Sequence, residues 1–184
     1  MGALRPPEPA AFFCALTFHD AAWGEKGEER LSERLGPPAL RSTPLPFTHT
    51  AYYEEEMGQG LFKRLLCFEE LRNPGELPSV KRWTNALEAE LAEAGRRRVN
   101  LDPGYLTGAK VVLASTKDFA HRVYLGSRIY GEVTLLCKAG AYQALPWTYP
   151  DYRQGAVLDF LDECRRWYLG KRRAQHAPKV PGRG

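Results

Sequence analysis

The sequence predicts an α+β fold of the ferredoxin-like type, with a β-α-β-β-α-β order and an antiparallel sheet that carries its helices on one face. Two observations lead to this prediction. In the first part of the chain, apolar stretches of strand length alternate with two stretches of helical periodicity. Further on, short apolar stretches follow one another directly, so we expect C-terminal hairpins and a terminal helix to extend the sheet.

The composition suits one soluble domain. The chain has 184 residues, 43% hydrophobic and 26% charged, which is enough to bury a core. We expect a loose leader at residues 1–10, a single α+β domain at 11–169 and a basic disordered tail at 170–184. The tail contains the basic residues that make the net charge +4, so it could contact nucleic acid. The domain itself is nearly neutral, and no broad basic face is expected on it.

Neither a membrane segment nor a secretion signal is expected. No apolar run is long enough to span a bilayer, and the N-terminus lacks the apolar core of a signal peptide. We therefore predict a cytoplasmic protein without membrane contact. The four cysteines lie far apart and at no metal-binding spacing, which predicts reduced, buried thiols.

The first half of the chain contains three strand signals and two helix signals. The nearly continuous apolar run at residues 12–18 predicts an interior strand covered on both faces. Asp20 is a candidate N-cap for a helix at 21–35. Prolines restrict residues 40–47 to an edge strand or an extended segment, and residues 61–68 form the next strand.

A second helix is predicted at residues 79–94 by an apolar stripe of helical period. Lys81, Asn85 and Glu88 lie on another face of this helix and could point together at one site. The remaining expected elements are strands at residues 110–115, 121–125, 129–137 and 142–147 and a final helix at 155–168.

Several short motifs occur in a specific order along the chain: residues 52–58 (YYEEEMG), 84–85 (TN), 98–106 (RVNLDPGYL), 112–118 (VLASTKD), 121–125 (HRVYL), 129–130 (IY), 132–135 (EVTL) and 145–153 (LPWTYPDYR). Together they resemble the bacterial and archaeal domain of unknown function family 4416, from the first strand to the last helix. That family has no established activity. Some of its members carry an automatic GTP-binding label, so the resemblance implies GTP as one candidate ligand. The absence of a G-x-x-x-x-G-K-[ST] loop excludes a P-loop GTPase.

The stretch Asn100-Leu101-Asp102 is also similar to one in the folate-pathway pyrophosphokinases. There an acidic-Leu-acidic pair holds magnesium for phosphoryl transfer. Here Asn100 replaces the first acid, so Asp102 is the remaining candidate metal ligand and magnesium the candidate cofactor. The alternative interpretation is that Asp102, Pro103 and Gly104 form a turn, which the side chain of Asp102 caps.

Charged residues near this stretch complete the candidate site. Arg98 is two residues before Asn100 and is expected on the same strand face, where it could bind phosphate. Arg96 and Arg97 are explained by the negative end of the preceding helix dipole. The candidate catalytic residues are Asp102 or Glu132 as base and His121 as proton carrier. The candidate ligand-binding residues are Asn85, Arg98, Asn100, Tyr105, Lys117, Arg122, Asp151 and Arg153.

Two functions are consistent with this pattern. The first is binding of a small anionic ligand, phosphorylated or a nucleotide, in a polar pocket, with metal-assisted catalysis as an extension. The second is an RNA- or protein-binding module without chemistry, in which exposed aromatic residues and the basic tail make the contacts. The sequence does not decide whether the protein is an enzyme.

Overall fold

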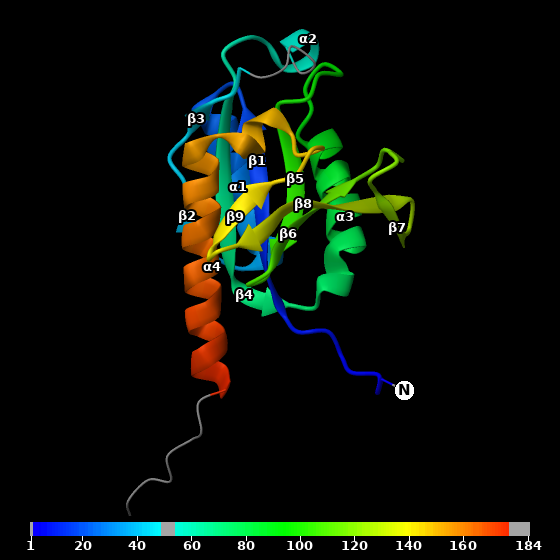
Figure 1. Cartoon of the computed structure of the whole chain (residues 1–184). Coiled ribbons are helices and arrows are strands. Elements are labelled where there is room, and N and C mark those ends of the chain that lie inside the picture. Colours follow the sequence, from blue (N-terminus) through cyan, green and yellow to red (C-terminus); the bar gives the residue numbers. More distant parts are fainter. Residues whose placement is uncertain (1, 49–53, 177–184) are drawn as a thin grey trace, which may run out of the picture.

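One large antiparallel sheet forms the centre of the protein (Figure 1). The structure, a computed structural model, describes residues 2–48 and 54–176. Within these residues the sheet has nine strands, and the main path runs β2-β4-β1-β5-β6-β8-β7. β3 pairs with β4 and β9 with β8, and every pairing is antiparallel. The predicted α+β class with an antiparallel sheet is therefore confirmed.

The strands are β1 (Ala10–Phe18), β2 (Pro38–Arg41), β3 (Leu45–Pro46), β4 (Phe62–Arg72), β5 (Val99–Leu106), β6 (Lys110–Ser115), β7 (Val123–Gly126), β8 (Ile129–Lys138) and β9 (Ala141–Ala144). The α-helices are α1 (Ala21–Leu35), α2 (Glu54–Met57), α3 (Leu77–Glu90) and α4 (Gly155–His176). Two short 3-10 helices are η2 (Pro74–Glu76) and η3 (Pro150–Arg153). The stretch between β3 and β4 lies partly outside the described residues.

β1 is buried along its whole length because helices cover both faces of the sheet. Phe12 and Leu16 pack in one core with α1 and α3, and Phe13 and Ala15 pack in a second core with α4. Figure 1 shows α4 crossing the front of the sheet, with α1 behind it. The prediction of an interior strand covered on both faces is confirmed, and alternate β1 side chains supply the two cores.

The prediction of a turn at Asp-Pro-Gly is wrong, because these residues belong to β5. Asp102, Pro103 and Gly104 lie within the strand and pair with β1 in unbroken register. Gly104 is needed because a Cβ there would lie 2.5 Å from the carbonyl oxygen of Val112 and 2.7 Å from the ring of Phe13. Close approach of neighbouring chains, and not a reversal of direction, therefore accounts for the glycine.

The second half of the chain forms the expected hairpins and terminal helix. The β7–β8 turn places Ser127 and Arg128 at positive φ, as tight hairpin turns require. α4 continues to His176, so residues 170–176, expected in a disordered tail, belong to this helix. Residues 177–184 lie outside the described part. Among the helices described, none is long and apolar enough to cross a membrane.

Candidate functional site

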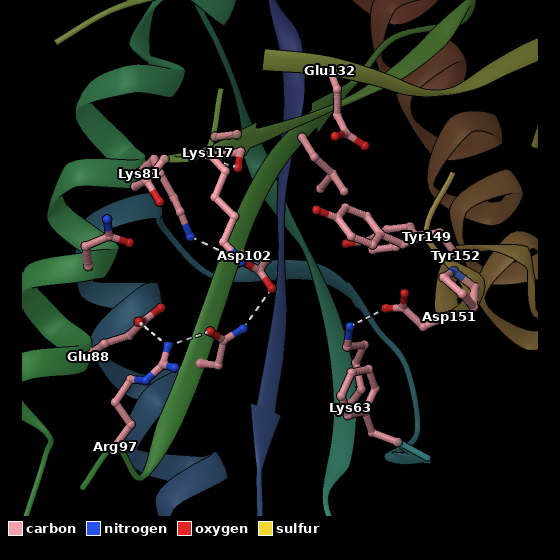
Figure 2. A pocket seen from close by; sticks show the side chains of 18 residues that line it. Lys63, Lys81, Glu88, Arg97, Asp102, Lys117, Glu132, Tyr149, Asp151 and Tyr152 are labelled. Carbon is pink, nitrogen blue, oxygen red and sulfur yellow. Dashed lines mark hydrogen bonds and ion pairs between the residues drawn. The ribbon is translucent and has the colours of Figure 1, made fainter. Parts of the chain in front are cut away.

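A cavity of about 520 Å³ lies where β5 and β6 separate (Figure 2). The two strands pair only between residues 104–106 and 111–113. Beyond these residues Asn100 and Asp102 of β5 line the cavity, and so does the end of β6 with Ser115. Pro103 lies just past the last paired residue, a position where its missing N–H removes no hydrogen bond to β6. The volume is in the range of small-molecule sites.

The polar side chains of Lys63, Asn100 and Asp102 line the cavity from one face of the sheet. Lys63, Thr17 and Asn100 are direct neighbours on β4, β1 and β5, so their side chains share one face of the sheet. Asp102 lies on the same face, opposite Ala15. The hydroxyl of Thr17 is buried and has no hydrogen-bond partner among the described residues.

Two charged residues of α3 bind the edge of β5 that β6 leaves free. Lys81 Nζ donates to the carbonyl oxygen of Leu101 at 2.9 Å, and Glu88 Oε1 accepts from the Leu101 N–H at 2.7 Å. These contacts satisfy the backbone N–H and C=O of Leu101, which does not pair with β6. Burial raises the pKa of Glu88, and the attraction of Lys81 and the bond from Leu101 only partly offset this effect.

Asp102 is held by hydrogen bonds on both carboxylate oxygens. Lys81 Nζ lies 3.2 Å from Oδ1, and Asn100 Nδ2 donates to Oδ2 at 2.7 Å. Asn100 in turn accepts from Arg97 Nη1 at 3.1 Å. Burial raises the pKa of Asp102, but the positive charges of Lys81 and Lys63 and the two hydrogen bonds outweigh it, so the pKa is lowered. Asp102 is therefore a stable carboxylate at neutral pH.

The opposite wall comes from η3 and the residue before it. Asp151 pairs with Lys63, whose Nζ also lies 4.3 Å from the ring centroid of Phe47. The side chains of Tyr149 and Tyr152 project into the cavity from this side (Figure 2). The Tyr152 hydroxyl is buried without a hydrogen-bond partner among the described residues. Burial, followed by the charges of Asp151 and Asp102, raises its pKa.

A buried ion pair between Arg122 and Glu132 of β8 borders the cavity, and Glu132 is part of the lining. Arg122 Nε lies 2.7 Å from Glu132 Oε2, and each side chain is 1% exposed. Arg122 also donates to the hydroxyls of Ser115 and Tyr149, and His121 Nε2 lies 3.2 Å from the same Glu132 oxygen. Arg122 therefore fixes cavity-lining side chains, while Glu132 is already neutralised by a cation.

The cavity gathers part of the candidate set. The predicted site residues that line the cavity are Asn85, Asn100, Asp102, Lys117, Glu132 and Asp151. The side chain of Lys117 extends toward Asp102 (Figure 2). These side chains come from α3, η3, the strands β5 and β8 and the loop that follows β6.

Five candidates lie elsewhere. His121 and Arg122 bind Glu132 from outside the cavity. Arg98 pairs with Glu93 at 3.3 Å, because β5 begins only at Val99 and strand alternation does not reach back to it. The other two are Tyr105, which packs against Phe12, and Arg153, which donates to the carbonyl oxygens of Leu145, Pro146 and Thr148.

A family model described as a domain of unknown function, DUF4416, matches residues 8–168. The chain belongs to the DUF4416 family. No curated protein and no solved structure matches it. The matched DUF4416 region contains every residue that lines the cavity.

Several cavity residues of this DUF4416 protein were not among the candidates. Lys63 had a usable signal, because a lysine inside a predicted apolar strand is rarely buried without a partner. Lys81 and Glu88 were noted on one helix face but not assigned to the site. Arg97, and not the predicted Arg98, contacts Asn100. No local pattern indicates Tyr152 as a site residue, because its burial depends on strands that are distant in sequence.

The residues do not fit the expected metal site. Among the side chains that the structure describes, no group of three or more His, Cys, Asp or Glu is placed to hold a metal ion. Asp102 contacts the ammonium group of Lys81 and the amide of Asn100. A metal cation next to Asp102 would be repelled by the positive charges of Lys81 and Lys63, which already stabilise this carboxylate. The assignment of Asp102 as a magnesium ligand is therefore not supported.

Proposed function

We propose that this DUF4416 protein binds a small anionic ligand, phosphorylated or a nucleotide, in the cavity between β5 and β6. The observation that carries the proposal is an excess of buried hydrogen-bond donors. An ammonium group has three N–H donors. Among the described contacts, Lys63 uses one of them on Asp151, and Lys81 uses two on Leu101 and Asp102. The Tyr152 hydroxyl uses none. Phosphate and carboxylate oxygens would satisfy these donors.

The charges around the cavity favour the same class of ligand. Each lining carboxylate already has a cationic partner: Asp102 with Lys81, Asp151 with Lys63, Glu132 with Arg122 and Glu88 with Arg97. The acids therefore do not form an uncompensated negative field. Lys117 adds a further cation to the lining. The predicted cytoplasmic location, where phosphorylated metabolites are abundant, agrees with this proposal.

Catalysis in this cavity would use Asp102. The Asp102 side chain is 32% exposed, whereas that of Glu132 is 1% exposed and held by Arg122. His121 contacts Glu132 but does not itself line the cavity, which argues against a proton-carrier role. We therefore retain Asp102 as the candidate base and omit metal assistance.

We also infer a ferredoxin-like unit within the larger sheet. The elements β1, α1, β2, β4, α3 and β5 follow the β-α-β-β-α-β order, and their strands lie in the sequence β2-β4-β1-β5. Both crossover helices pack with the same side chains of β1. β6, β7, β8 and β9 then extend the sheet, and the cavity lies at the junction between the unit and this extension.

A thermal-shift experiment tests the ligand proposal. The panel is inorganic phosphate, pyrophosphate, AMP, ATP and GTP, each with and without magnesium. A compound present at about one hundred times its Kd should raise Tm by about 5–10 °C for a chain of this size. We expect a magnesium-independent shift with at least one compound.

Two lysine variants make the experiment specific. Lys117→Gln removes an exposed cation of the lining, and affinity should fall about tenfold or more through the loss of a charge-assisted hydrogen bond. Lys138→Gln changes an exposed lysine at the end of β8, and this variant should bind as the unchanged protein does. No shift with any compound, or equal loss in both variants, would contradict the proposal.

The alternative of an RNA- or protein-binding module is favoured by a separate observation. Phe119, Tyr124 and Trp147 are 48%, 59% and 40% exposed. Trp147 stacks on His121 with the ring centroids 5.7 Å apart, and Phe119 lies 6.0 Å from the same imidazole. Such a row could stack on unpaired bases. A salt-sensitive gel shift with single-stranded RNA that disappears in Trp147→Ala would favour this function.

A further inference from the structure

Tyr149 occupies a special place at the mouth of the cavity. Its side chain is 41% exposed and also lines the cavity. Among the large exposed apolar and aromatic residues that the structure describes, it is the one that does both. Tyr152, by comparison, is 3% exposed and lies deeper. The entrance therefore offers an aromatic ring, while the interior offers polar groups.

The ring of Tyr149 is held in a fixed orientation. Its hydroxyl accepts a hydrogen bond from Arg122 Nη2, and the Arg122 guanidinium carbon lies 5.9 Å from the ring centroid. Arg122 is itself anchored by Glu132, Ser115 and the carbonyl oxygen of Lys117. An aromatic ring that is ordered before binding loses little conformational freedom when a ligand arrives.

The anion-binding donors lie further inside. The side chains of Lys63 and Lys81 are each 7% exposed. Tyr152, whose buried hydroxyl has no hydrogen-bond partner among the described residues, has its ring centroid 5.5 Å from Lys63 Nζ. The exposed ring of Tyr149 lines the same cavity as these buried donors. An anionic group alone would leave that ring unused, whereas a molecule with an anionic end and a flat end would contact both regions.

We propose that the ligand of this cavity carries a planar ring that stacks on Tyr149, and that its anionic group lies inside, beside Lys63 and Lys81. This places the ligand in the class of nucleoside phosphates and not among simple phosphate esters or inorganic phosphate. The inference rests on the proposed function, because it assigns a second contact region to the same site. Stacking on an aromatic side chain is strong enough to dominate the discrimination between these classes.

The experiment compares ligands that differ only in the ring. Ribose 5-phosphate is measured by calorimetry beside AMP, GMP, CMP and UMP on the full chain. We expect at least one nucleoside monophosphate to bind tenfold or more tightly than ribose 5-phosphate. Tyr149→Ala should abolish this margin, while leaving the weaker affinity for ribose 5-phosphate within about twofold.

Two further variants separate stacking from structural damage. Tyr149→Phe keeps the ring, loses the bond to Arg122 and should retain most of the margin. Tyr124→Ala removes an exposed tyrosine of β7 that does not line the cavity, and should retain all of it. Circular dichroism melts check that each variant folds.

The outcomes for the two proposals are distinct. Equal affinity for ribose 5-phosphate and all four nucleotides would overturn the stacking inference and leave the anion proposal standing. A nucleotide margin that persists in Tyr149→Ala would have the same meaning. If none of the five compounds binds, the stacking inference fails, and if no compound of the thermal-shift panel raises Tm either, the anion proposal fails with it.

Discussion

Asn100 connects two charged groups by using both halves of its amide. Its oxygen accepts from Arg97 at 3.1 Å, and its nitrogen donates to Asp102 at 2.7 Å. A carboxylate at this position could accept from Arg97 but could not donate to Asp102. The asparagine therefore fits a hydrogen-bonded support for one carboxylate, and the similarity to an acidic metal-binding pair does not extend to its chemistry.

The substitution Asn100→Asp tests this role. It removes the amide donor and places a second carboxylate beside Asp102, so we expect a loss of about 1–3 kcal/mol and a Tm lowered by about 3–8 °C at pH 7. Two neighbouring carboxylates share a proton more readily in the folded state, so the loss should shrink as pH falls toward 5. Thermal melts across pH measure it. Asn85→Asp is the matched control, because Asn85 also lines the cavity and has no side-chain hydrogen bond among the described contacts. An equal loss at pH 5 and pH 7 would argue against the role.

Glu88 gives the protein a pH dependence of the opposite kind to that of Asp102. Because its pKa is raised in the folded state, the folded protein binds a proton here more strongly than the unfolded chain does. The contribution of Glu88 to the free energy of unfolding therefore decreases as pH rises through this range. Asp102, with a lowered pKa, loses its contribution as pH falls.

Glu88→Gln should remove the first of these effects. Glutamine keeps an oxygen that can accept from the Leu101 N–H but carries no charge to bury. The difference in Tm between variant and unchanged protein should therefore increase in favour of the variant from pH 4.5 to pH 7. Glu93→Gln, at an exposed carboxylate paired with Arg98, should run parallel to the unchanged protein. A constant offset at every pH would show that Glu88 acts only through its hydrogen bond.

At the scale of elements, the main structural feature is the separation of β6 from β5. Gly104 brings β5 close to Val112 and Phe13, and from there toward Asn100 the strands no longer pair. α3 then supplies Lys81 and Glu88 to the free edge. The sequence alone allows a turn at Pro103 and Gly104, because proline and glycine also favour chain reversals. Only the register with β1 shows that both belong to a strand.

Gly104→Ala tests the need for close approach in β5. The added methyl group would meet a backbone oxygen and an aromatic ring in the core, so we expect a loss of about 2–3 kcal/mol and a Tm lower by about 5–10 °C. Gly155→Ala is the matched control, because nothing lies within 4 Å of a Cβ there and the helix begins at this residue. Its Tm should be unchanged or slightly higher. Equal effects of the two substitutions would contradict the steric account.

At the scale of the whole molecule, elements with a strong period were predictable and the cavity was only partly so. The apolar run of β1 and the stripe of α3 identified both elements, since burial imposes those patterns locally. Asn100, Asp102 and Lys117 were found because they are close in sequence to a polar cluster. Lys63 and Tyr152 reach the cavity through long-range pairing and through the position of η3. No local pattern encodes that juxtaposition.

The opening between β5 and β6 has a consequence for how the protein would respond to occupancy. The sheet is elsewhere a continuous partition between the core of α1 and α3 and the core of α4. At the opening, residues from α3 and from η3 border the same space. A ligand bound there would contact residues of both layers, the one that contains α3 and the one that contains η3. Its binding would therefore reduce the mobility of both layers together.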